Sequence, residues 1–560
     1  MNTTTVPPRR RLYTQPGANG QPSVTVTLTP AHRTDTVQIV VQLNHVLPVV
    51  FVPGIMGSNL KKSGTENAVW RLDDEEKLGL SMGFKNAGER QRLLHPNRVE
   101  VDPRGKVPES PVGVLRTAAD FRARGWGEVG HTSYNEFLVW AEKNFNSQRC
   151  EGTDEDTYGR LGATLLVVKD GRAWGAQKPF DPLTEDESRS AQGWSYPVHA
   201  CGYNWLDDNE IAAQRLAKRI DEIIAQYSGG MSRCTQVIVI THSMGGLVAR
   251  RCAQLPGMAQ KIAGVVHGVM PAVGAPVAYR RCKVGMMDEG ASGIGKAALG
   301  SWGVARVIGA TGQEVTAVFA QSPGALQLLP TAEYPRAWLE VRDIDSASLS
   351  MAGRMDTAKP YDTVYTERQQ WWGLVKEDWL KPKDGEPLTW TTYLKTLRLA
   401  SSFHAKLNAS AAVPYHPNTY AFYGHGVPSF ETVCWQIETL PTEWRSKRLA
   451  GTQALDVRHD RAVMDGTNPE QLRGAVQGAP TYNVQLLPAA DSGDGTVPVA
   501  SGRAPLPNVH QIFGIPGIEH EPAYKSGIAQ HVTAYAITRI AASAAQAIGA
   551  GKTTKPGAAR

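Results

Sequence analysis

The chain has 560 residues, of which 41% are hydrophobic, and a net charge of +6. This apolar content is enough for a large core and excludes a disordered chain. The charge is too weak at this length to favour a nucleic acid as a partner. None of the six cysteines belongs to a C-x-x-C pair, so their spacing supports neither a zinc or other metal site nor redox pairing.

The N-terminal segment, residues 1–22, is polar and rich in proline and glycine, which predicts a flexible tail. No hydrophobic stretch follows Arg9, Arg10 and Arg11, so we do not interpret this segment as a Sec signal. Apolar runs elsewhere stay below the ~18 residues of a transmembrane helix. We therefore expect a protein made in the cytoplasm that does not leave the cell by the Sec route.

Short apolar runs alternate with helical periods in the regions that we predict to form the core. Residues 47–52 (LPVVFV) end at a Pro-Gly pair, as a buried parallel strand does where it meets a loop. Residues 208–227 have apolar positions at helical spacing, and a strand over 237–241 (VIVIT) follows. A helix over 246–255 and a strand over 262–269 continue the alternation. This order predicts a parallel sheet with helices on both faces.

Long stretches between these elements lack regular periodicity, and we predict that they are insertions. In the first of them, residues 135–145 have the spacing of an amphipathic helix, and residues 161–169 have the composition of a strand. Later core elements are strands over 419–423, 482–487 and 509–514 and a helix over 528–548. The predicted organisation is a tail over 1–22, a discontinuous core over 23–69, 196–284, 416–429 and 481–549, a first cap over 70–195, a second cap or lid over 285–415, a third insertion over 430–480 and a loose tail over 550–560.

Tryptophans are frequent in the second insertion, which contains Trp302, Trp338, Trp371, Trp372, Trp379 and Trp390. Tryptophan suits the membrane interface because it combines an apolar ring with a polar N–H group. One interpretation is a lid around residues 338–390 that opens at a lipid surface. The alternative is that these rings fill an ordinary core.

The segment VIVITHSMGG (237–246) joins a buried strand, a tight turn and a helix, with Ser243 at the apex of the turn. This is the context of a nucleophile elbow, which lifts a serine hydroxyl out of a sheet. The helix that follows directs its N-terminal amides toward the same space. Thr241 stands where the G-x-S-x-G pattern has its first glycine, and a β-branched residue suits a strand end. The alternative is an ordinary strand-to-helix turn with a capping serine.

A serine nucleophile needs a general base, and the base needs an acid that orients it. In sheets of this kind the chain order is serine, acid, histidine, so both partners are expected downstream. Asp494 lies between Gly493 and Gly495, which free the backbone to direct a carboxylate. His520 follows at a point where a strand runs into a loop. We predict that Ser243, Asp494 and His520 form the catalytic triad.

Other residues compete for these roles. Asp491 is the alternative acid. His242 adjoins the serine, so its side chain should point away from the Oγ atom, and His531 falls within the terminal helix, where packing is the simpler role. His425 precedes the acid and breaks the chain order, and His510 is a further candidate.

The tetrahedral intermediate of such a reaction also needs an oxyanion hole. One donor is expected to be the amide of Met244, the residue after the nucleophile. The second should come from a loop after an early strand, and PGIMGS (53–58) has glycines that allow close approach. We predict that the amide of Met56 is this donor, with Ile55 as the alternative.

Several separated motifs together resemble the lecithin–cholesterol acyltransferase-like branch of the α/β-hydrolases. They are VVFVPGIMGSNL (49–60), YPVHACGYNW (196–205), THSMGG (241–246), GDGTVP (493–498), GIEHEPAY (517–524) and, at the expected lid boundary, SPGALQLLP (322–330). The resemblance implies an α/β-hydrolase fold, with a mostly parallel central sheet, helices on both faces and large cap or lid insertions. The site residues that it implies are Ser243, Asp494, His520, Met244 and Met56.

Within this branch the chain is most similar to the antibacterial phospholipase effectors of type VI secretion, specifically the fourth lipase-effector family. The resemblance implies a secreted toxin that hydrolyses acyl esters of membrane phospholipids, without a cofactor. It implies a component of the secretion apparatus and a cognate immunity protein as partners, and no nucleic acid. It also implies export from the bacterial cytoplasm into a target cell, whose periplasm or membranes hold the substrate.

Three other functions remain open. A transacylase or a neutral lipase would keep the same fold and triad and would change the acceptor or the substrate. A scaffold that binds a partner protein through its caps needs no triad. A complete serine, aspartate and histidine set in the expected chain order argues against this last alternative.

Overall fold

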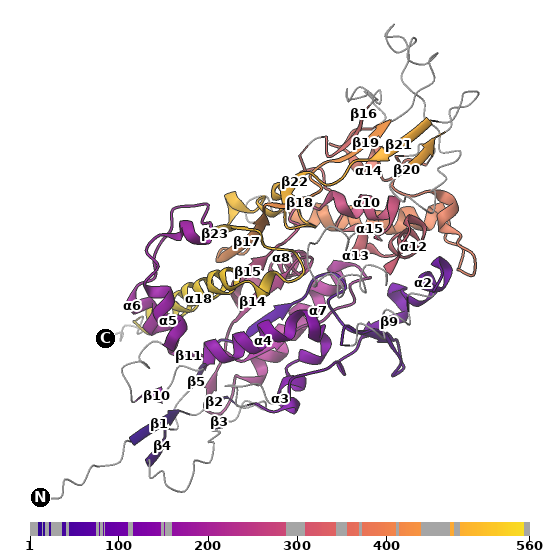
Figure 1. Cartoon of the computed structure of the whole chain (residues 1–560). Helices are drawn as coiled ribbons and strands as arrows, with labels where there is room; N and C mark the ends of the chain where they lie inside the picture. Colours follow the sequence, from indigo (N-terminus) through magenta and orange to yellow (C-terminus); the bar gives the residue numbers. More distant parts are fainter. Residues whose placement is uncertain are drawn as a thin grey trace, which may run out of the picture.

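The computed structural model describes most of the chain (Figure 1). The described residues are 9–13, 15–16, 22–23, 36–40, 44–73, 78, 82, 85–109, 116–146, 150–151, 159–286, 308–335, 337–342, 355–368, 372–409, 414–437, 471–474 and 482–553. Within these ranges, no helix is long and apolar enough to cross a membrane.

Six parallel strands form the central sheet. Their order is β12 (Val198–Ala200), β6 (Val49–Val52), β14 (Val237–His242), β15 (Ile262–Gly268), β17 (Thr419–His425) and β23 (Gln511–Pro516). In β14, Ile238 pairs with Val49 on one side and with Gly264 on the other. Because all six strands run the same way, their carboxyl ends meet at one edge of the sheet. The predicted α/β fold with a parallel central sheet is confirmed.

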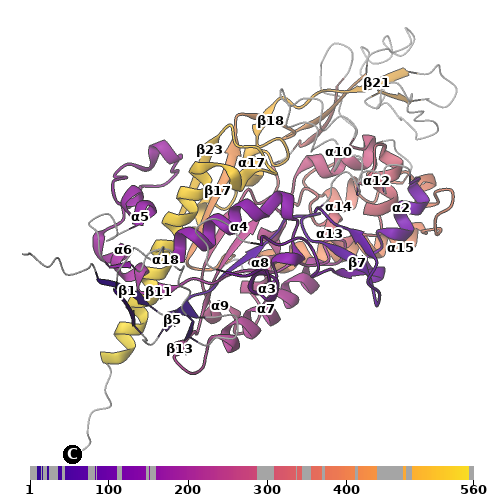
Figure 2. The same cartoon turned by 60° about the horizontal axis from the view of Figure 1, so that its bottom comes forward.

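Helices cover both faces of this sheet (Figures 1 and 2). One face packs against α7 (Asn209–Gln226) and α8 (Gly245–Ala253), and the other packs against α4 (His131–Asn146) and α18 (Gly527–Thr553). Each face of the sheet has its own hydrophobic core, and alternate residues of β14 belong to different cores. Val239 belongs to the core on the side of α7 and α8, whereas Ile238 and Ile240 belong to the core on the side of α4 and α18. A strand that is buried on both faces has a continuous apolar run, which explains the VIVIT segment.

The helix α7 illustrates how the sequence period produces these layers. Asp208 caps its N-terminus, since a carboxylate oxygen accepts the amide of Glu210 at 3.0 Å. Leu216 and Ile220 lie one turn apart and are fully buried, whereas Ile211 is 53% exposed. Each large apolar side chain buried in this way stabilises the fold by about 1.5–3 kcal/mol.

The first insertion differs from its prediction in two respects. Its helix α4 is not part of a cap, because Phe137 and Leu138 pack into the core of the central sheet. Residues 161–169, predicted as a strand, include instead the helix α5 (Gly159–Leu166). A short apolar run fits either structure, and Val167 is 74% exposed, unlike a residue of a buried strand. Other elements of the insertion are α2 (Ala87–Leu93), β9 (Val99–Val101), α3 (Ala118–Ala123), α6 (Glu185–Gln192) and β11 (Trp194–Ser195). The strands β5 (Asn44–Val46), β7 (Leu60–Lys62) and β8 (Ala68–Trp70) begin before it.

A second sheet of four strands is separate from the central one (Figure 1). Its order is β16 (Leu339–Arg342), β19 (Val433–Ile437), β21 (Tyr482–Leu486) and β20 (Gln471–Gly474). Residues 482–487 therefore include a strand, as predicted, but their assignment to the central sheet is wrong. The antiparallel partners of β21 come from the third insertion, and a strand pattern in the sequence does not identify its partner.

Helices make up much of the second insertion and the segment that leads into it. They are α10 (Pro276–Val284), α12 (Gly312–Phe319), α13 (Pro323–Leu326), α14 (Pro360–Thr363) and α15 (Trp390–Ala409). Trp338 and Trp372 are each 1% exposed, so these rings fill a core. Trp379 and Trp390 are half-buried. The other two, Trp302 and Trp371, lie outside the described residues. The described tryptophans therefore do not form an exposed row that could meet a lipid surface in this conformation.

Both chain termini contain structure that the sequence did not predict. Within the expected N-terminal tail, Arg9–Tyr13 forms β1, which pairs in parallel with β4 (Thr36–Val40). At the other end α18 continues to Thr553, beyond the expected end of the core at residue 549.

A buried histidine of the central sheet makes the stability depend on pH. Burial, with smaller contributions from Arg250 and His416, lowers the pKa of His267 in β15 from 6.5 to about 3. Because only the unfolded chain binds this proton between those values, stability falls as the pH drops below about 6.5. His267→Gln should make this fall shallower by about one proton, or ~1.4 kcal/mol per pH unit. Urea unfolding of both proteins from pH 6.5 to 4 measures the slopes, and parallel slopes would contradict the assignment.

Candidate active site

The serine turn joins β14 to α8 at the carboxyl edge of the central sheet. Ser243 has a backbone φ of 53°, a left-handed conformation that residues other than glycine rarely adopt. Its amide donates to the carbonyl of Gly268 at 2.9 Å, and its carbonyl accepts the amide of Gly246 at 2.9 Å. These bonds hold the strained turn in place, and the turn has the strand–turn–helix geometry predicted for a nucleophile elbow.

Two glycines near this turn leave room that a side chain would fill. A Cβ atom on Gly245 would lie 2.5 Å from the carbonyl oxygens of Val52 and Pro53. A Cβ atom on Gly54 would lie 2.9 Å from the Cβ atom of Ser243. The loop after β6 and the start of α8 therefore approach each other more closely than a larger residue would allow.

The predicted acid lies directly after β22 (Asp491–Gly493). One carboxylate oxygen of Asp494 accepts the amides of Thr496 and Val497 at 3.0 and 2.7 Å. The other oxygen lies 2.8 Å from Nδ1 of His520. Asp494 is only 2% exposed, so hydrogen bonds from the protein, rather than water, compensate its charge.

His520 lies between the acid and the serine, in the loop after β23. Its Nε2 atom is 2.8 Å from Ser243 Oγ, and its amide donates to the carbonyl of Asp494 at 2.9 Å. Since an ionised carboxylate can only accept, Nδ1 carries the imidazole proton and Nε2 is free to accept the serine hydroxyl proton. The structure thus brings together the three residues that the sequence predicted as a triad.

The competing residues have other partners. Among the described residues, Asp491 accepts two backbone amides that follow β18 (Val427–Ser429) and bonds to no histidine. His510 and His531 contact the rings of other aromatic residues, and His425 ends β17. His242 is buried, and its two ring nitrogens bond to groups other than Ser243 Oγ, as its position next to the serine predicted.

The two predicted oxyanion residues come from two different segments, the loop after β6 and the serine turn itself. Met56, in the loop after β6, has a φ of 63°, and its carbonyl accepts Nε1 of Trp70 at 2.8 Å. Met244 is the N-cap residue of α8 and is fully buried. In the described part of the chain, the amides of Met56 and Met244 donate to no other group. Neither amide is therefore committed to a main-chain partner among the described residues.

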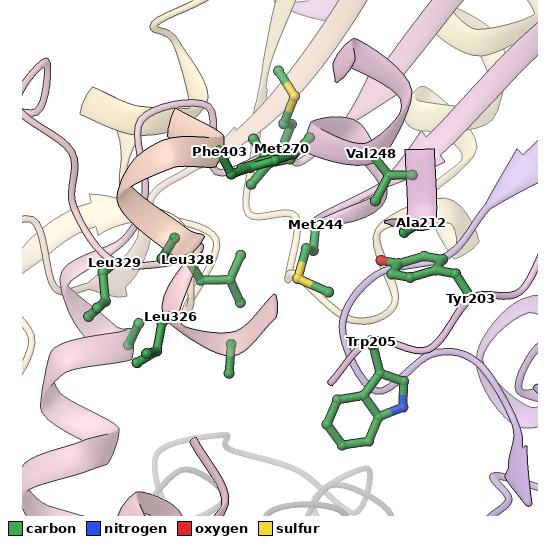
Figure 3. Packing of buried hydrophobic residues seen from close by; sticks show 14 of the residues in the cluster. Tyr203, Trp205, Ala212, Met244, Val248, Met270, Leu326, Leu328, Leu329 and Phe403 are labelled. Carbon is green, nitrogen blue, oxygen red and sulfur yellow. The ribbon is translucent and has the colours of Figure 1, made fainter. Parts of the chain in front are cut away.

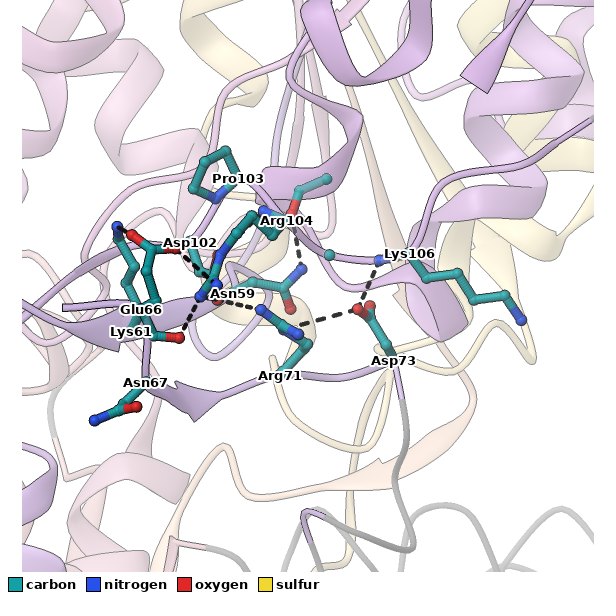
Figure 4. Close-up of polar contacts among 12 residues, drawn as sticks. Asn59, Lys61, Glu66, Asn67, Arg71, Asp73, Asp102, Pro103, Arg104 and Lys106 are labelled. Atoms are coloured by element: carbon teal, nitrogen blue, oxygen red, sulfur yellow. Dashed lines mark hydrogen bonds and ion pairs between the residues drawn. The ribbon is translucent and has the colours of Figure 1, made fainter. Parts of the chain in front are cut away.

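A polar network ties the loop after β6 to the first insertion (Figure 4). The side-chain amide of Asn59 donates to two backbone carbonyls of that insertion. The main-chain carbonyl of Asn59 accepts the amide of Asp102, whose buried carboxylate pairs with Arg71 and Arg104. Burial alone would raise the pKa of the Asp102 carboxyl, but the hydrogen bonds from both arginines outweigh it and hold the pKa below its usual range.

Apolar side chains surround Met244 on the side of the second insertion (Figure 3). Leu326 and Leu328, at the C-terminal end of α13, and Phe403 of α15 belong to the same buried cluster as Met244. Ser243 itself is only 4% exposed. The proposed nucleophile is therefore nearly buried in this structure, whereas the His520 side chain is 14% exposed.

One residue that no sequence motif marks also reaches the site. Tyr134, in the first turn of α4, accepts the amide of Gly54 at 3.2 Å, and its hydroxyl lies 3.0 Å from Nδ1 of His242. It lies one residue before the helix that the sequence predicted over 135–145. No local pattern distinguishes it from an ordinary core tyrosine, so sequence reasoning missed it.

The close approach at Gly245 gives a stability prediction. Gly245→Ala should lower the free energy of unfolding by about 1–3 kcal/mol, because the new methyl group would force the serine turn away from β6. Gly527→Ala is the matched control, since Gly527 also begins a helix but has open space around it. Urea unfolding should show the control to be neutral or slightly stabilised. Equal stabilities of the two variants would contradict this packing.

Comparisons with known proteins agree with this architecture. The model of the PGAP1-like α/β domain family matches residues 209–288, which contain the serine turn. The chain is similar to a chain of the solved Tle4-Tli4 complex, with 28% sequence identity and a TM-score of 0.69, over 89% of this chain and 99% of that chain. No curated protein matches the sequence. The predicted resemblance is thus confirmed, and the chain has an α/β-hydrolase fold that is similar to Tle4 over nearly its whole length.

Proposed function

We propose that the protein is a serine carboxylic-ester hydrolase, of phospholipase A or lipase type, that cleaves acyl esters of membrane phospholipids. The observation that carries this proposal is the position of His520, which lies 2.8 Å from both Ser243 Oγ and Asp494 Oδ2. A buried acid, an imidazole and a hydroxyl group in this order form the arrangement that activates a serine. The similarity to a chain of the Tle4-Tli4 complex agrees with the resemblance of the sequence motifs to the lipase effectors, and together they support lipid esters as the substrate class.

In the proposed reaction Ser243 Oγ attacks the ester carbonyl carbon, and His520 Nε2 takes the hydroxyl proton. His520 then returns the proton to the leaving alcohol as the tetrahedral intermediate collapses to an acyl-enzyme. Water attacks the acyl carbon while His520 takes its proton. His520 then returns this proton to Ser243 Oγ as the bond between Oγ and the acyl group breaks and the fatty acid is released. Asp494 holds the Nδ1 proton in place and stabilises the imidazolium form in each step.

The amides of Met244 and Met56 are the proposed donors to the intermediate's oxyanion. Met244 begins α8, so the partial positive charge of the helix N-terminus adds to its donor. The left-handed backbone at Met56 is a strained conformation in a loop whose glycines approach the serine turn, and such strain is common at functional sites. One oxyanion donor typically contributes about 10²–10³-fold to the rate.

Lipid entry requires movement of the segments that bury Ser243. We assign this movement to the second insertion, residues 285–415, because its Leu326, Leu328 and Phe403 belong to the same buried cluster as Met244. We do not assign this movement to the tryptophans of the insertion. Trp338 and Trp372 are core residues, and Trp379 and Trp390 are half-buried.

Partners and location follow from analogy with Tle4, which forms a complex with Tli4. We propose that this chain also has a cognate immunity protein, that a component of a type VI secretion apparatus carries it, and that it acts on membranes of a target cell. The support is the similarity in fold and sequence, which is an argument from analogy.

A transacylase or a neutral lipase would use the same residues, and the products separate these alternatives. Transfer of the acyl group to an added alcohol identifies a transacylase, whereas hydrolysis of triacylglycerol in preference to phospholipid identifies a neutral lipase. A non-catalytic scaffold would release no fatty acid from either lipid.

The triad assignment predicts the effect of single substitutions on hydrolysis. Ser243→Ala and His520→Ala should each lower the hydrolysis rate by roughly 10³- to 10⁶-fold, because each removes a member of one catalytic unit. Phosphatidylethanolamine–phosphatidylglycerol vesicles serve as substrate, and mass spectrometry identifies the fatty acid and lysophospholipid products.

Ser501→Ala is the matched control for the serine substitution. Ser501 is also fully buried, and its hydroxyl accepts the amide of Val273 at 3.2 Å. This variant should hydrolyse the vesicles at close to the wild-type rate. Full hydrolysis by Ser243→Ala would show that the proposed nucleophile is wrong.

A further inference from the structure

A chain of buried and partly buried hydrogen bonds ends at the proposed base and joins three separate parts of the fold. The amide of Gly54 donates to the Tyr134 hydroxyl at 3.2 Å, and that hydroxyl lies 3.0 Å from Nδ1 of His242. The Nε2 atom of His242 lies 2.8 Å from the main-chain carbonyl of His520. The chain thus connects the loop after β6, the first turn of α4 and the loop that carries the proposed base.

The directions of these hydrogen bonds follow from the chemistry of the groups. The carbonyl of His520 can only accept, so Nε2 of His242 must carry the imidazole proton. Nδ1 of His242 is then an acceptor, and the Tyr134 hydroxyl donates to it. The tyrosine oxygen in turn accepts the amide of Gly54. Every donor in the chain has one acceptor, and no alternative direction satisfies all four groups.

Burial keeps this arrangement in one protonation state. It lowers the pKa of His242 from 6.5 to about 3, with a further contribution from His520, so the ring is neutral near neutral pH. Burial also raises the pKa of the Tyr134 hydroxyl above its ordinary value. Neither group therefore exchanges a proton with a substrate under ordinary conditions, and their role is to fix positions.

We propose that Tyr134 and His242 are positioning residues for the hydrolysis, holding the backbones of His520 and of the Gly54–Gly57 loop in register with Ser243. The proposal rests on the proposed function of the triad. Asp494 orients the His520 imidazole through Nδ1, and His242 holds the main chain of the same residue on its other side. The Gly54–Gly57 loop is held in the same way, because the amide of Gly54, its first residue, donates to the hydroxyl oxygen of Tyr134.

The packing around Tyr134 isolates the contribution of its hydroxyl group. Its ring contacts Phe51, with centroids 4.9 Å apart, and His242, with centroids 5.5 Å apart. A phenylalanine keeps these ring contacts and removes only the oxygen. The loop also closes around this oxygen, since a Cβ atom on Gly57 would lie 2.6 Å from it.

The first test compares Tyr134→Phe with Tyr535→Phe. Tyr535 is an equally buried tyrosine on α18, and its hydroxyl donates to the carbonyl of Asp181 at 2.7 Å. Three quantities are measured for each protein: kcat and KM on a soluble p-nitrophenyl ester, the rate constant for modification of Ser243 by a fluorophosphonate, and the urea midpoint.

Tyr134→Phe should lower kcat and the modification rate by about 10- to 100-fold, with KM within about twofold of wild type, because misplacement of the reacting groups by up to 1 Å has effects of this size. Tyr535→Phe should lose similar stability and keep both rates. If the two variants react alike, Tyr134 is an ordinary core residue and the proposal is overturned.

A second pair of variants tests the contact with His520. In His242→Gln, the side-chain amide nitrogen takes the place of Nε2 and can still donate to the His520 carbonyl. In His242→Asn, the side chain ends near the position of Nδ1 and cannot reach that carbonyl. The glutamine variant should retain at least about tenfold more kcat than the asparagine variant. Equal rates would show that the bond to His520 has no role in catalysis.

Hydrogen–deuterium exchange separates this proposal from the proposed function, because it does not depend on catalysis. Tyr134→Phe should speed exchange in peptides that contain residues 54–57 and 517–521, and Tyr535→Phe should not. If Tyr134→Phe speeds exchange in these peptides but the wild-type protein hydrolyses no ester, the result supports the network and rejects the proposed function. Unchanged exchange together with wild-type hydrolysis that requires Ser243 would reject the network and leave the function in place.

Discussion

The left-handed backbone at Ser243 is the constraint on which the rest of the site depends. A non-glycine residue in this conformation costs of order 1–3 kcal/mol and persists only where the surroundings determine it fully. The surroundings here are the carbonyl of Gly268 and the close approach of Gly54 and Gly245. This approach brings the start of α8 against the loop after β6, so the nucleophile turn and the candidate oxyanion loop share one packed interface.

Two histidines near this turn have opposite roles because their environments differ. His242 is fully enclosed, is neutral because burial lowers its pKa, and bonds through both nitrogens to fixed groups. His520 is the more exposed of the two and lies between a carboxylate and a hydroxyl group. The sequence neighbour of the serine therefore stabilises the framework, and the distant histidine is the one whose Nε2 can accept a proton.

The sequence was sufficient to predict the elements whose signals are local. The strand–turn–helix around Ser243 and the glycines beside Asp494 are each encoded within a few residues, and the chain order of serine, acid and histidine led from these motifs to His520. Pairing between distant segments was not predictable in this way. Residues 482–486 have a strand pattern, but their partners come from the third insertion, and residues 161–169 have an apolar run that fits either a strand or a helix. Tyr134 was missed for the same reason, since its partners lie 80 and 108 positions away.

The central claim is that Ser243 is a nucleophile activated by His520, and one measurement tests it directly. The protein is treated with a fluorophosphonate, digested, and mapped by mass spectrometry. The account predicts one adduct, on the peptide that contains Ser243, and loss of that adduct in His520→Ala while the protein stays folded. No adduct on the folded wild-type protein, or an adduct on a different serine, would contradict it.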